Sequence, residues 1–315
     1  MIDRYFCRRP YDMKSLVSII IPTRNRCDLL KSCLRSIRRS TYHDYETIII
    51  NNKSSDETAT MIQAEYPEVK VIETERNMFA AKGRNLGIRK AKGEYLLFID
   101  DDNEIDSKMI DELVSLFNSD TRIGLAGPKM YYCESKNMLW WTGATINLLT
   151  SRTTYRGLNC PDIGQYEHTG ETGHIPNVVM IKREVYDLIG GFDEIYKMSY
   201  SESDFAMRAI KAGYRVMYCP QAVTCHNTLL SGPSATPFKV PMRAYFFAKN
   251  RVIYMKKYSS IWQFWVFMIV FYPLFTIYYL SKINWIHNFS TIKMHLLGTW
   301  DGLIYGIIGK LNNYY

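Results

Sequence analysis

The sequence predicts an α/β fold in which a mostly parallel sheet is flanked by helices. Short apolar runs rich in isoleucine, valine and aromatic residues alternate with helix-like segments between residues 16 and 118. Polar residues follow the second and fourth of these runs, at the sheet edge where open α/β sheets bind their ligands. Alternation of this kind gives parallel strands joined by right-handed crossovers, a Rossmann-like arrangement.

The elements follow one another without a long gap up to residue 120. The run 16–22 ends in proline, 45–50 leads into a polar loop with several candidate N-caps, and Gly93 closes the third helix. No GxGxxG follows the first strand, so a dinucleotide-binding fingerprint is absent. The expected strands are 16–22, 45–50, 69–72 and 95–99, and the expected helices are 27–39, a segment ending near residue 65, 79–92 and 107–118.

After residue 120 the pattern loosens, and short strands and loops are expected up to residue 175. Helix-like segments follow at 183–189 and 203–212, and a strand-like run ends at His226. We expect residues 1–235 to form one domain, with residues 236–315 as a separate tail.

Three consecutive aspartates, Asp100, Asp101 and Asp102, directly follow the buried strand 95–99. Their mutual repulsion is tolerable if a divalent cation is shared among them or if water screens them. Oxygen ligands suit Mg²⁺ or Mn²⁺, which commonly bind few carboxylates together with substrate phosphates. The alternative is an acidic helix start in which Asp102 or Asn103 caps the helix 107–118.

The net charge of +8 is concentrated in the tail. Residues 236–315 contain nine Lys or Arg and a single acid, Asp301, so the first 235 residues hold 30 charges of each sign. A nucleic-acid-binding domain would carry basic surface on its folded body, so no nucleic-acid partner is expected. A basic tail beside apolar residues indicates an anionic membrane surface as partner.

The tail contains an uncharged apolar run over 261–280, which is long enough for a bilayer-spanning helix. Tryptophan and tyrosine lie near its ends, as interfacial aromatic residues do, and Pro273 should kink it. Lysine and arginine precede it, which predicts a location on the cytoplasmic face of a membrane, either peripheral or monotopic or single-pass. A buried core helix, a re-entrant segment and an interfacial segment are the alternatives.

The seven cysteines form no CxxC pair, and the polar, basic start of the chain has no secretory signal. We therefore expect reduced, mostly buried thiols in a cytoplasmic protein and no zinc site.

Five motifs stand in order along residues 17–228: VSIIIPTRNR, IIINNKSSDET, NMFAAKGRNLGI, FIDDDNEID, and GGFDEIY followed by YSESDFAMRAIKAGYRV. In type and order they resemble the motifs of family 2 glycosyltransferases, which are nucleotide-sugar-dependent enzymes of the GT-A fold. Further stretches, GPKMYY, Trp141–Gly143, Arg156–Gly157 and GTWDGLIYGIIG, resemble the rhamnosyltransferase-like subgroup that builds cell-surface glycans.

The resemblance implies a donor site, a metal site, a catalytic base and an acceptor side. Two departures from the family pattern stand out: Asn51 replaces the usual Asp, and Ser201-Glu202-Ser203-Asp204 replaces Glu-Asp-x-Asp. The donor-binding residues would be Pro22, Thr23, Arg24, Asn51, Asn52, Arg84, Asp100 and Asp101, the metal ligands Asp102, Asp100 and His226, the base Glu202, and the acceptor side Trp141 and Asp204.

Several of these residues also have a structural alternative. Glu202 could be an exposed acid at a helix start, and Arg84 could lie on a solvated helix face. Asp204 could orient Glu202 or cap its helix, with Arg208 pairing with it at i, i+4. His226 could be structural, and Trp141 could belong to the core or face a membrane.

The predicted function is that of an inverting, Mg²⁺- or Mn²⁺-dependent glycosyltransferase. It would move a hexosyl or deoxyhexosyl group from a nucleoside-diphosphate sugar to a lipid-linked or cell-surface glycan acceptor. One alternative is a sugar-1-phosphate nucleotidyltransferase, which would need a glycine-rich loop after the first strand that PTRNRCDLL does not provide. The other is a membrane-tethered, non-catalytic nucleotide-sugar-binding protein.

Overall fold

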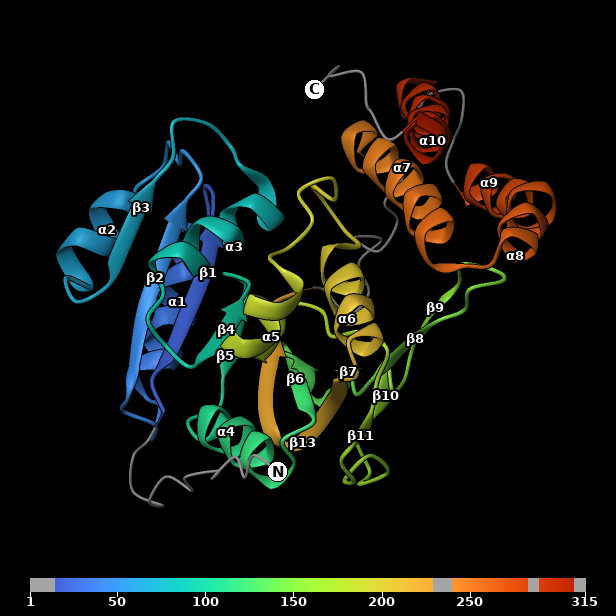
Figure 1. The fold of residues 1–315 in the computed structure, drawn as a ribbon. Coiled ribbons are helices and arrows are strands. Elements are labelled where there is room, and N and C mark those ends of the chain that lie inside the picture. The colour runs from blue at the N-terminus through green and yellow to red at the C-terminus, as the bar shows by residue number, and fades with distance from the viewer. Residues whose placement is uncertain (1–14, 229–239, 283–288, 309–315) are drawn as a thin grey trace, which may run out of the picture.

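The computed structural model describes residues 15–228, 240–282 and 289–308. Its first part is a parallel half-sheet in the order β3-β2-β1-β4, with helices in the crossovers, which confirms the predicted α/β class (Figure 1). The elements are β1 (Val17–Thr23), α1 (Cys27–Arg38), β2 (Tyr45–Asn51), α2 (Thr58–Glu65), β3 (Lys70–Glu73), α3 (Phe79–Lys90) and β4 (Tyr95–Ile99).

The second part makes the sheet mixed. Strand β12 runs antiparallel between β4 and β6, while β13 pairs parallel with β6 and antiparallel with β5. The elements are β5 (Asn103–Ile105), α4 (Met109–Ser119), β6 (Ile123–Tyr132), β7 (Ser135–Trp141), β8 (Ala144–Ile146), β9 (Thr153–Tyr155), β10 (Cys160–Pro161), β11 (Gly170–Glu171), β12 (Val178–Lys182), α5 (Arg183–Ile189), α6 (Ser201–Lys211) and β13 (Arg215–His226).

Three local expectations for this part were wrong. Ile123–Tyr132 is one long and almost entirely buried strand; its two glycines and Pro128 weakened the strand signal. Strand β12 was missed altogether. Neither Asp102 nor Asn103 caps the following helix, because Asn103–Ile105 pairs with β13 as a strand and α4 begins only at Met109.

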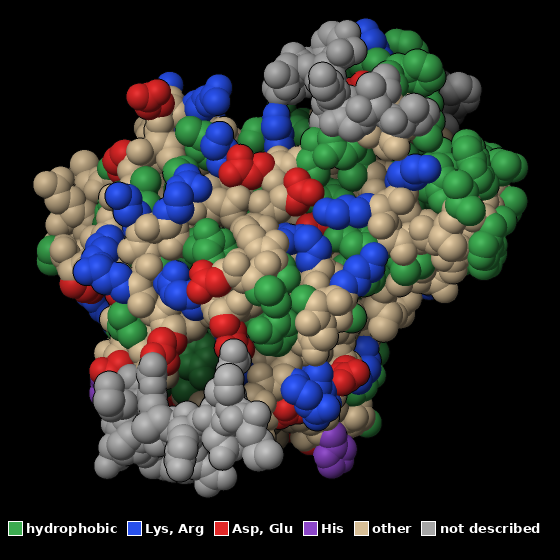
Figure 2. All heavy atoms as spheres, in the orientation of Figure 1, with side chains coloured by type: hydrophobic (Ala, Val, Ile, Leu, Met, Phe, Trp, Pro, Cys, Tyr) green, Lys and Arg blue, Asp and Glu red, His purple; other side chains and the backbone are tan. Residues whose placement is uncertain are grey.

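The C-terminal part is helical and lies beyond the end of the sheet (Figure 1). Pro241 is at the start of α7 (Pro241–Tyr258), where its missing N–H costs nothing, and a Ser260–Gln263 capping box starts α8 (Ile261–Val266). A π-helical turn, η3 (Phe267–Phe271), then leads into α9 (Tyr272–Lys282), and α10 (Phe289–Ile308) follows. Figure 2 shows hydrophobic side chains gathered over α8 and α9.

The π-helical turn ends two residues before Pro273, where the sequence predicted a kink. Proline lacks the N–H that would bond to the carbonyl one turn earlier, and its ring crowds that carbonyl. A widened turn relieves this clash. The apolar run is therefore three helical segments rather than one uniform helix.

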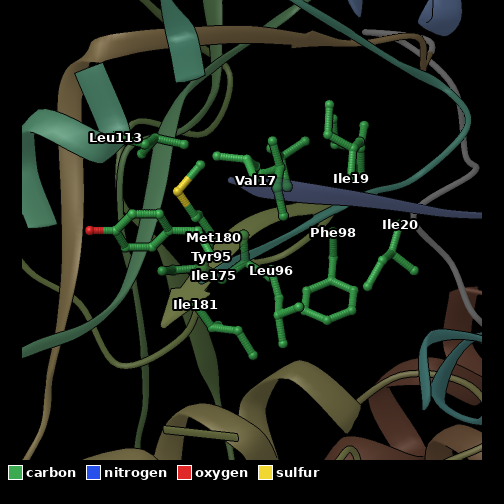
Figure 3. Packing of buried hydrophobic residues seen from close by; sticks show 14 of the residues in the cluster. Val17, Ile19, Ile20, Tyr95, Leu96, Phe98, Leu113, Ile175, Met180 and Ile181 are labelled. Carbon is green, nitrogen blue, oxygen red and sulfur yellow. The ribbon is translucent and has the colours of Figure 1, made fainter. Parts of the chain in front are cut away.

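The core is built around β4, whose residues Leu96, Leu97, Phe98 and Ile99 are fully buried, as predicted. Figure 3 shows Leu96 and Phe98 packed with residues of β1 and β12. Because β4 has β1 on one side and β12 on the other, its carboxyl end is held rigidly at the sheet edge.

The prediction that all cysteines are reduced is wrong for two of them: Cys133 and Cys225 form a disulfide. They are 92 residues apart in sequence, and the pairing of β6 with β13 brings them together. Only Cys33 and Cys219 of the four described free cysteines are buried, whereas Cys160 is exposed. Cys7 and the polar start of the chain lie outside the described residues.

Candidate active site

A cleft of about 790 Å³ opens at the carboxyl ends of β1 and β4. Strand β1 brings Pro22 and Thr23 to its wall, and β4 ends at the aspartate cluster Asp100–Asp102. The opposite wall comes from distant segments: the start of α6 with Glu202, the end of β13 with His226, and α7 with Arg243 and Phe247. The fold thus brings the two acidic motifs of the sequence into one cavity.

Arg26 pairs with two of the three aspartates. Thr23 Oγ1 donates to Asp101 Oδ2 at 2.7 Å, and Arg26 Nη1 lies 2.9 Å from Asp101 Oδ1 and 2.7 Å from Asp102 Oδ2. His226 Nε2 is 3.5 Å from the other oxygen of Asp102. Burial raises the pKa of Asp101 to about 6, even though Arg26 and Thr23 act to lower it.

Arg84 joins the aspartate cluster to Glu202. Its guanidinium is 1% exposed, with Nη2 2.7 Å from Asp100 Oδ1 and Nη1 hydrogen-bonded to Glu202 Oε1. Burial acts to raise the pKa of Glu202, but the charge and hydrogen bond of Arg84 outweigh it and lower that pKa to about 2. Burial raises the pKa of Asp100, with Arg84 opposing. Glu202 is therefore an ionised carboxylate at neutral pH.

The backbone before Glu202 is in an uncommon conformation that α7 stabilises. Ser199 and Tyr200 have φ values of 62° and 67°, in the left-handed region that non-glycine residues rarely adopt. Asn250 Nδ2 donates to the carbonyls of Met198 at 2.6 Å and Ser199 at 3.2 Å. Strained backbone of this kind clusters at functional sites, and here it aims the first turn of α6 at the cleft.

A second polar group lies beside Glu202. His174 accepts or donates hydrogen bonds on both ring nitrogens, with Nδ1 3.3 Å from Ser203 Oγ and Nε2 3.3 Å from Tyr155 OH. All three residues line the cleft, and burial lowers the pKa of His174 to about 4. His174 is therefore a neutral hydrogen-bonding group at neutral pH.

Burial of His174 predicts a loss of stability in mild acid. Its folded pKa of about 4 lies below the ordinary value of 6.5, so the unfolded chain binds a proton first as the pH falls. Between pH 6.5 and 4 this residue should remove about 3 kcal/mol from the free energy of unfolding. Urea unfolding at a series of pH values should show a shallower pH dependence for His174→Gln than for wild type.

The exposed His43 supplies the matched control, because His43→Gln should leave the wild-type pH dependence unchanged. Parallel pH curves for wild type and His174→Gln would contradict the assignment of a neutral buried imidazole.

Most residues predicted for the site line the cleft. These are Pro22, Thr23, Arg24, Asn52, Arg84, Asp100, Asp101, Asp102, Glu202 and His226. Arg84 is not on a solvated helix face, and Glu202 is not an exposed helix-start acid, since its side chain is 17% exposed.

Three predicted residues lie outside the cleft. Asn51 is buried, and its amide donates to Glu73 and accepts from the Ser54 N–H. Trp141 is fully buried, with its ring edge-on to Tyr218, so it cannot stack on a sugar.

Asp204 is also fully buried, and it neither caps α6 nor reaches Glu202. Its carboxylate pairs with Arg208 at 2.8 Å, in the i, i+4 arrangement expected from the sequence, and with Lys257 of α7 at 2.7 Å. Asp204 thus fastens α7 to α6.

Sequence reasoning missed Arg26, Tyr155 and His174, which line the cleft together with Trp140. Arg26 stands within the PTRNR motif, so its position next to the first strand was the one signal available. Trp140 packs edge-on against His226, with ring centroids 4.7 Å apart. No local sequence pattern identifies Tyr155 or His174 as site residues. They reach the cleft only because β9 and residues 172–177 fold over it.

The residues present fit a divalent cation only in part. Within the described ranges, no group of three or more His, Cys, Asp or Glu side chains is arranged to hold a metal ion. Asp102 and His226 do lie side by side, and His226 Nδ1 is buried with no hydrogen-bond partner. A carboxylate and an imidazole suit Mn²⁺, and phosphate oxygens of a substrate could complete the coordination.

The parallel half-sheet, with an aspartate cluster at the end of β4, defines the GT-A class of fold. Residues 18–190 match the family model described as glycosyl transferase family 2. The match covers more than half of the chain, and the chain belongs to that family.

Individual relatives agree with this assignment. The glycosyltransferase YibD of Escherichia coli is 35% identical over 205 residues, covering 63% of this chain and 58% of YibD. The mannosyltransferase PcManGT of Pyrobaculum calidifontis, solved with GDP-Man and Mn²⁺, has a TM-score of 0.55 at 16% identity, covering 96% of this chain and 92% of its own. GalNAc-T7, solved with UDP, GalNAc and Mn²⁺, has a TM-score of 0.58 at 17% identity, covering 76% of this chain and 51% of its own.

These two structures establish the shared fold. The chain spans between 18% and 59% of the length of three curated relatives that it matches.

Proposed function

We propose that the protein transfers a sugar from a nucleoside-diphosphate sugar to a hydroxyl of a lipid-linked or cell-surface glycan acceptor, with inversion at the anomeric carbon. The observation that carries this proposal is that Glu202 and Asp100 face one cleft and are joined by the buried guanidinium of Arg84. A proton acceptor and a phosphate-binding edge are thereby held side by side, as the transfer requires.

The chemistry is a single displacement. The acceptor oxygen attacks the anomeric carbon, the new carbon–oxygen bond forms as the bond to the diphosphate oxygen breaks, and the hydroxyl proton passes to Glu202. The nucleoside diphosphate leaves with the bonding electron pair. Glu202 is ionised when the acceptor arrives, since its pKa is lowered to about 2.

Donor binding is assigned to the ends of β1 and β2 and to the aspartate cluster. The nucleoside would contact the part of the cleft wall near the ends of β1 and β2. This part is lined by Pro22, Thr23, Arg24 and Asn52. Asp102 and His226 would hold a divalent cation, which when bound compensates charge on the leaving diphosphate. The Mn²⁺ bound in PcManGT and GalNAc-T7 supports this cofactor.

The donor sugar is assigned to the hexoses or deoxyhexoses by the rhamnosyltransferase-like stretches of the sequence. We place the protein on the cytoplasmic face of a membrane because the tail contains nine basic residues and one acid.

The proposal is tested by donor binding and turnover with Mn²⁺. A panel of nucleotide sugars should yield at least one that raises the melting temperature only when Mn²⁺ is present, and chelation should abolish that rise. Asp102→Asn should lose the Mn²⁺-dependent rise, whereas Asp187→Asn, at an exposed site on α5, should keep it. Donor stabilisation without sugar transfer to any acceptor would instead favour a non-catalytic binding protein.

A further inference from the structure

The C-terminal helices expose an apolar surface that the catalytic reaction does not use. Within the described residues, Ile261–Tyr278 is the one helical segment whose length and mean hydropathy of 1.6 would allow it to cross a membrane, and 17% of it is buried. Many large apolar side chains of this segment are exposed, and so are several on α10. They are Ile261 (70%), Trp262 (59%), Trp265 (52%), Ile269 (72%), Val270 (45%), Leu274 (58%), Ile277 (64%) and Tyr278 (56%), and on α10 Phe289 (73%), Leu296 (58%) and Trp300 (62%).

The middle of this segment is fastened to α10. The ring of Tyr272 stacks on His295 with centroids 5.9 Å apart, and its hydroxyl lies 3.4 Å from His295 Nε2. The same hydroxyl is hydrogen-bonded to Thr299 Oγ1, one turn further along α10. A helix that crossed a bilayer alone would not have polar contacts at its midpoint with a helix of the folded body.

Helix α10 is in turn fastened to α7 by unusually close packing. A Cβ on Gly298 would lie 2.2 Å from the carbonyl oxygen of Tyr245, and one on Gly302 would lie 2.8 Å from that of Lys249. Glycine at i and i+4 lets the two backbones touch. Beside this contact, the hydroxyl of Tyr245 donates to Asp301 at 2.5 Å.

Helix α7 belongs to the catalytic body. It supplies Arg243 and Phe247 to the cleft, Asn250 to the loop before Glu202, and Lys257 to Asp204. It also carries Lys249 and Arg251, which are buried against the body. Helix α7 therefore cannot lie in the hydrocarbon of a bilayer. Because α10 packs against α7 and also contacts the apolar segment, this segment is held next to α7 and cannot cross the bilayer away from it.

We propose that the exposed faces of α8, α9 and α10 form a membrane-docking surface that lies in the plane of an anionic bilayer interface instead of crossing the bilayer. The charge pattern identifies the occupant as anionic lipid. Lys256 and Lys293 are exposed at the ends of this surface, and the single acid of residues 236–315, Asp301, is 8% exposed. Tryptophan beside basic residues on one helical face is the pattern of interfacial helices.

The geometry also connects this surface to the cleft. Because α7 contacts both, docking would set the mouth of the cleft at a fixed height above the lipid headgroups. This step deepens the proposed function: it implies an acceptor presented by the same membrane. Membrane binding itself requires neither donor nor catalysis, so the two proposals can fail separately.

Flotation of the full-length protein with vesicles of phosphatidylethanolamine and phosphatidylglycerol tests the docking surface. Trp262→Glu combined with Trp265→Glu should lower the partition constant by about tenfold or more, because both side chains are exposed on α8 and lose apolar contact with lipid. Leu188→Glu, at a 63%-exposed site on α5, should leave it unchanged. Equal flotation of all three proteins would overturn the proposal. Melting temperatures and donor turnover in detergent show separately whether fold and activity persist.

Site-directed labelling distinguishes in-plane docking from spanning. Lys256→Cys and Ser281→Cys place a thiol at an exposed position on either side of the apolar segment. In sealed, inside-out membrane vesicles, an impermeant maleimide should label both positions to the same extent. The labelling of wild type is subtracted as background. Labelling of one position only before detergent is added would establish a spanning helix and overturn the proposal.

Discussion

Replacement of Glu202 by glutamine is expected to lower the rate of sugar transfer by about 10²–10⁴-fold while donor binding is retained. Glutamine has nearly the same shape and can still accept the hydrogen bond of Arg84 through its carbonyl oxygen. It cannot accept the proton of the attacking hydroxyl. The measurement is kcat with saturating donor and acceptor, together with the Mn²⁺-dependent shift in melting temperature caused by the donor.

Glu184→Gln is the matched control, since Glu184 is an exposed glutamate at the start of the neighbouring helix α5. Its kcat should equal that of wild type. If Glu202→Gln retained full kcat, the proton would have to leave by another route, and Glu202 would be only a partner of Arg84.

Replacement of Arg84 by methionine is expected to produce the largest loss of stability. Methionine fills much of the same space but leaves the carboxylates of Asp100 and Glu202 without the buried cation that each contacts. Breaking a buried ion pair by removing one partner typically costs about 3–5 kcal/mol, and urea unfolding at pH 7.5 should show a loss of that size. Sugar transfer should fall as well, because both sides of the cleft lose their common anchor.

The pH dependence distinguishes this cause from a simple packing defect. In wild type the pKa of Glu202 is lowered from 4.5 to about 2, so its stabilising effect is present above pH 4.5 and is lost as the pH falls toward 2. Without Arg84, burial should raise the pKa of both carboxyls above their unfolded values. The deficit of Arg84→Met should therefore shrink as the pH falls toward about 5.

Arg89→Met changes an exposed arginine on the same helix and should cost little. A deficit in Arg84→Met that is constant from pH 7.5 to 5 would indicate lost packing instead of unpaired charge.

Two of the single-residue errors in the predicted site, Asn51 and Trp141, have a common cause. Side chains along an extended segment point alternately to opposite faces, so of two neighbouring residues one can line the cleft while the other is buried. Trp140 lines the cleft while Trp141 is fully buried, and Asn52 lines it while Asn51 does not. The resemblance located the correct motif in each case, but the choice between neighbours depends on which face of the strand meets the cavity.

The sequence by itself determined the features that depend on local pattern. Apolar runs and their spacing were enough to predict the parallel half-sheet, the aspartates at the end of β4, the helix that begins near Glu202 and the basic, apolar tail. These properties follow from residues close together in the chain, where periodicity and charge can be read directly.

The tertiary structure decided what depends on distant segments meeting. Arg84 and Glu202 are 118 residues apart, and Cys133 and Cys225 are 92 apart. The Tyr155–His174–Ser203 group and the attachment of Tyr272 to α10 likewise join separate elements. No local pattern encodes such contacts, because they arise only when sheet pairing and helix packing bring the elements together.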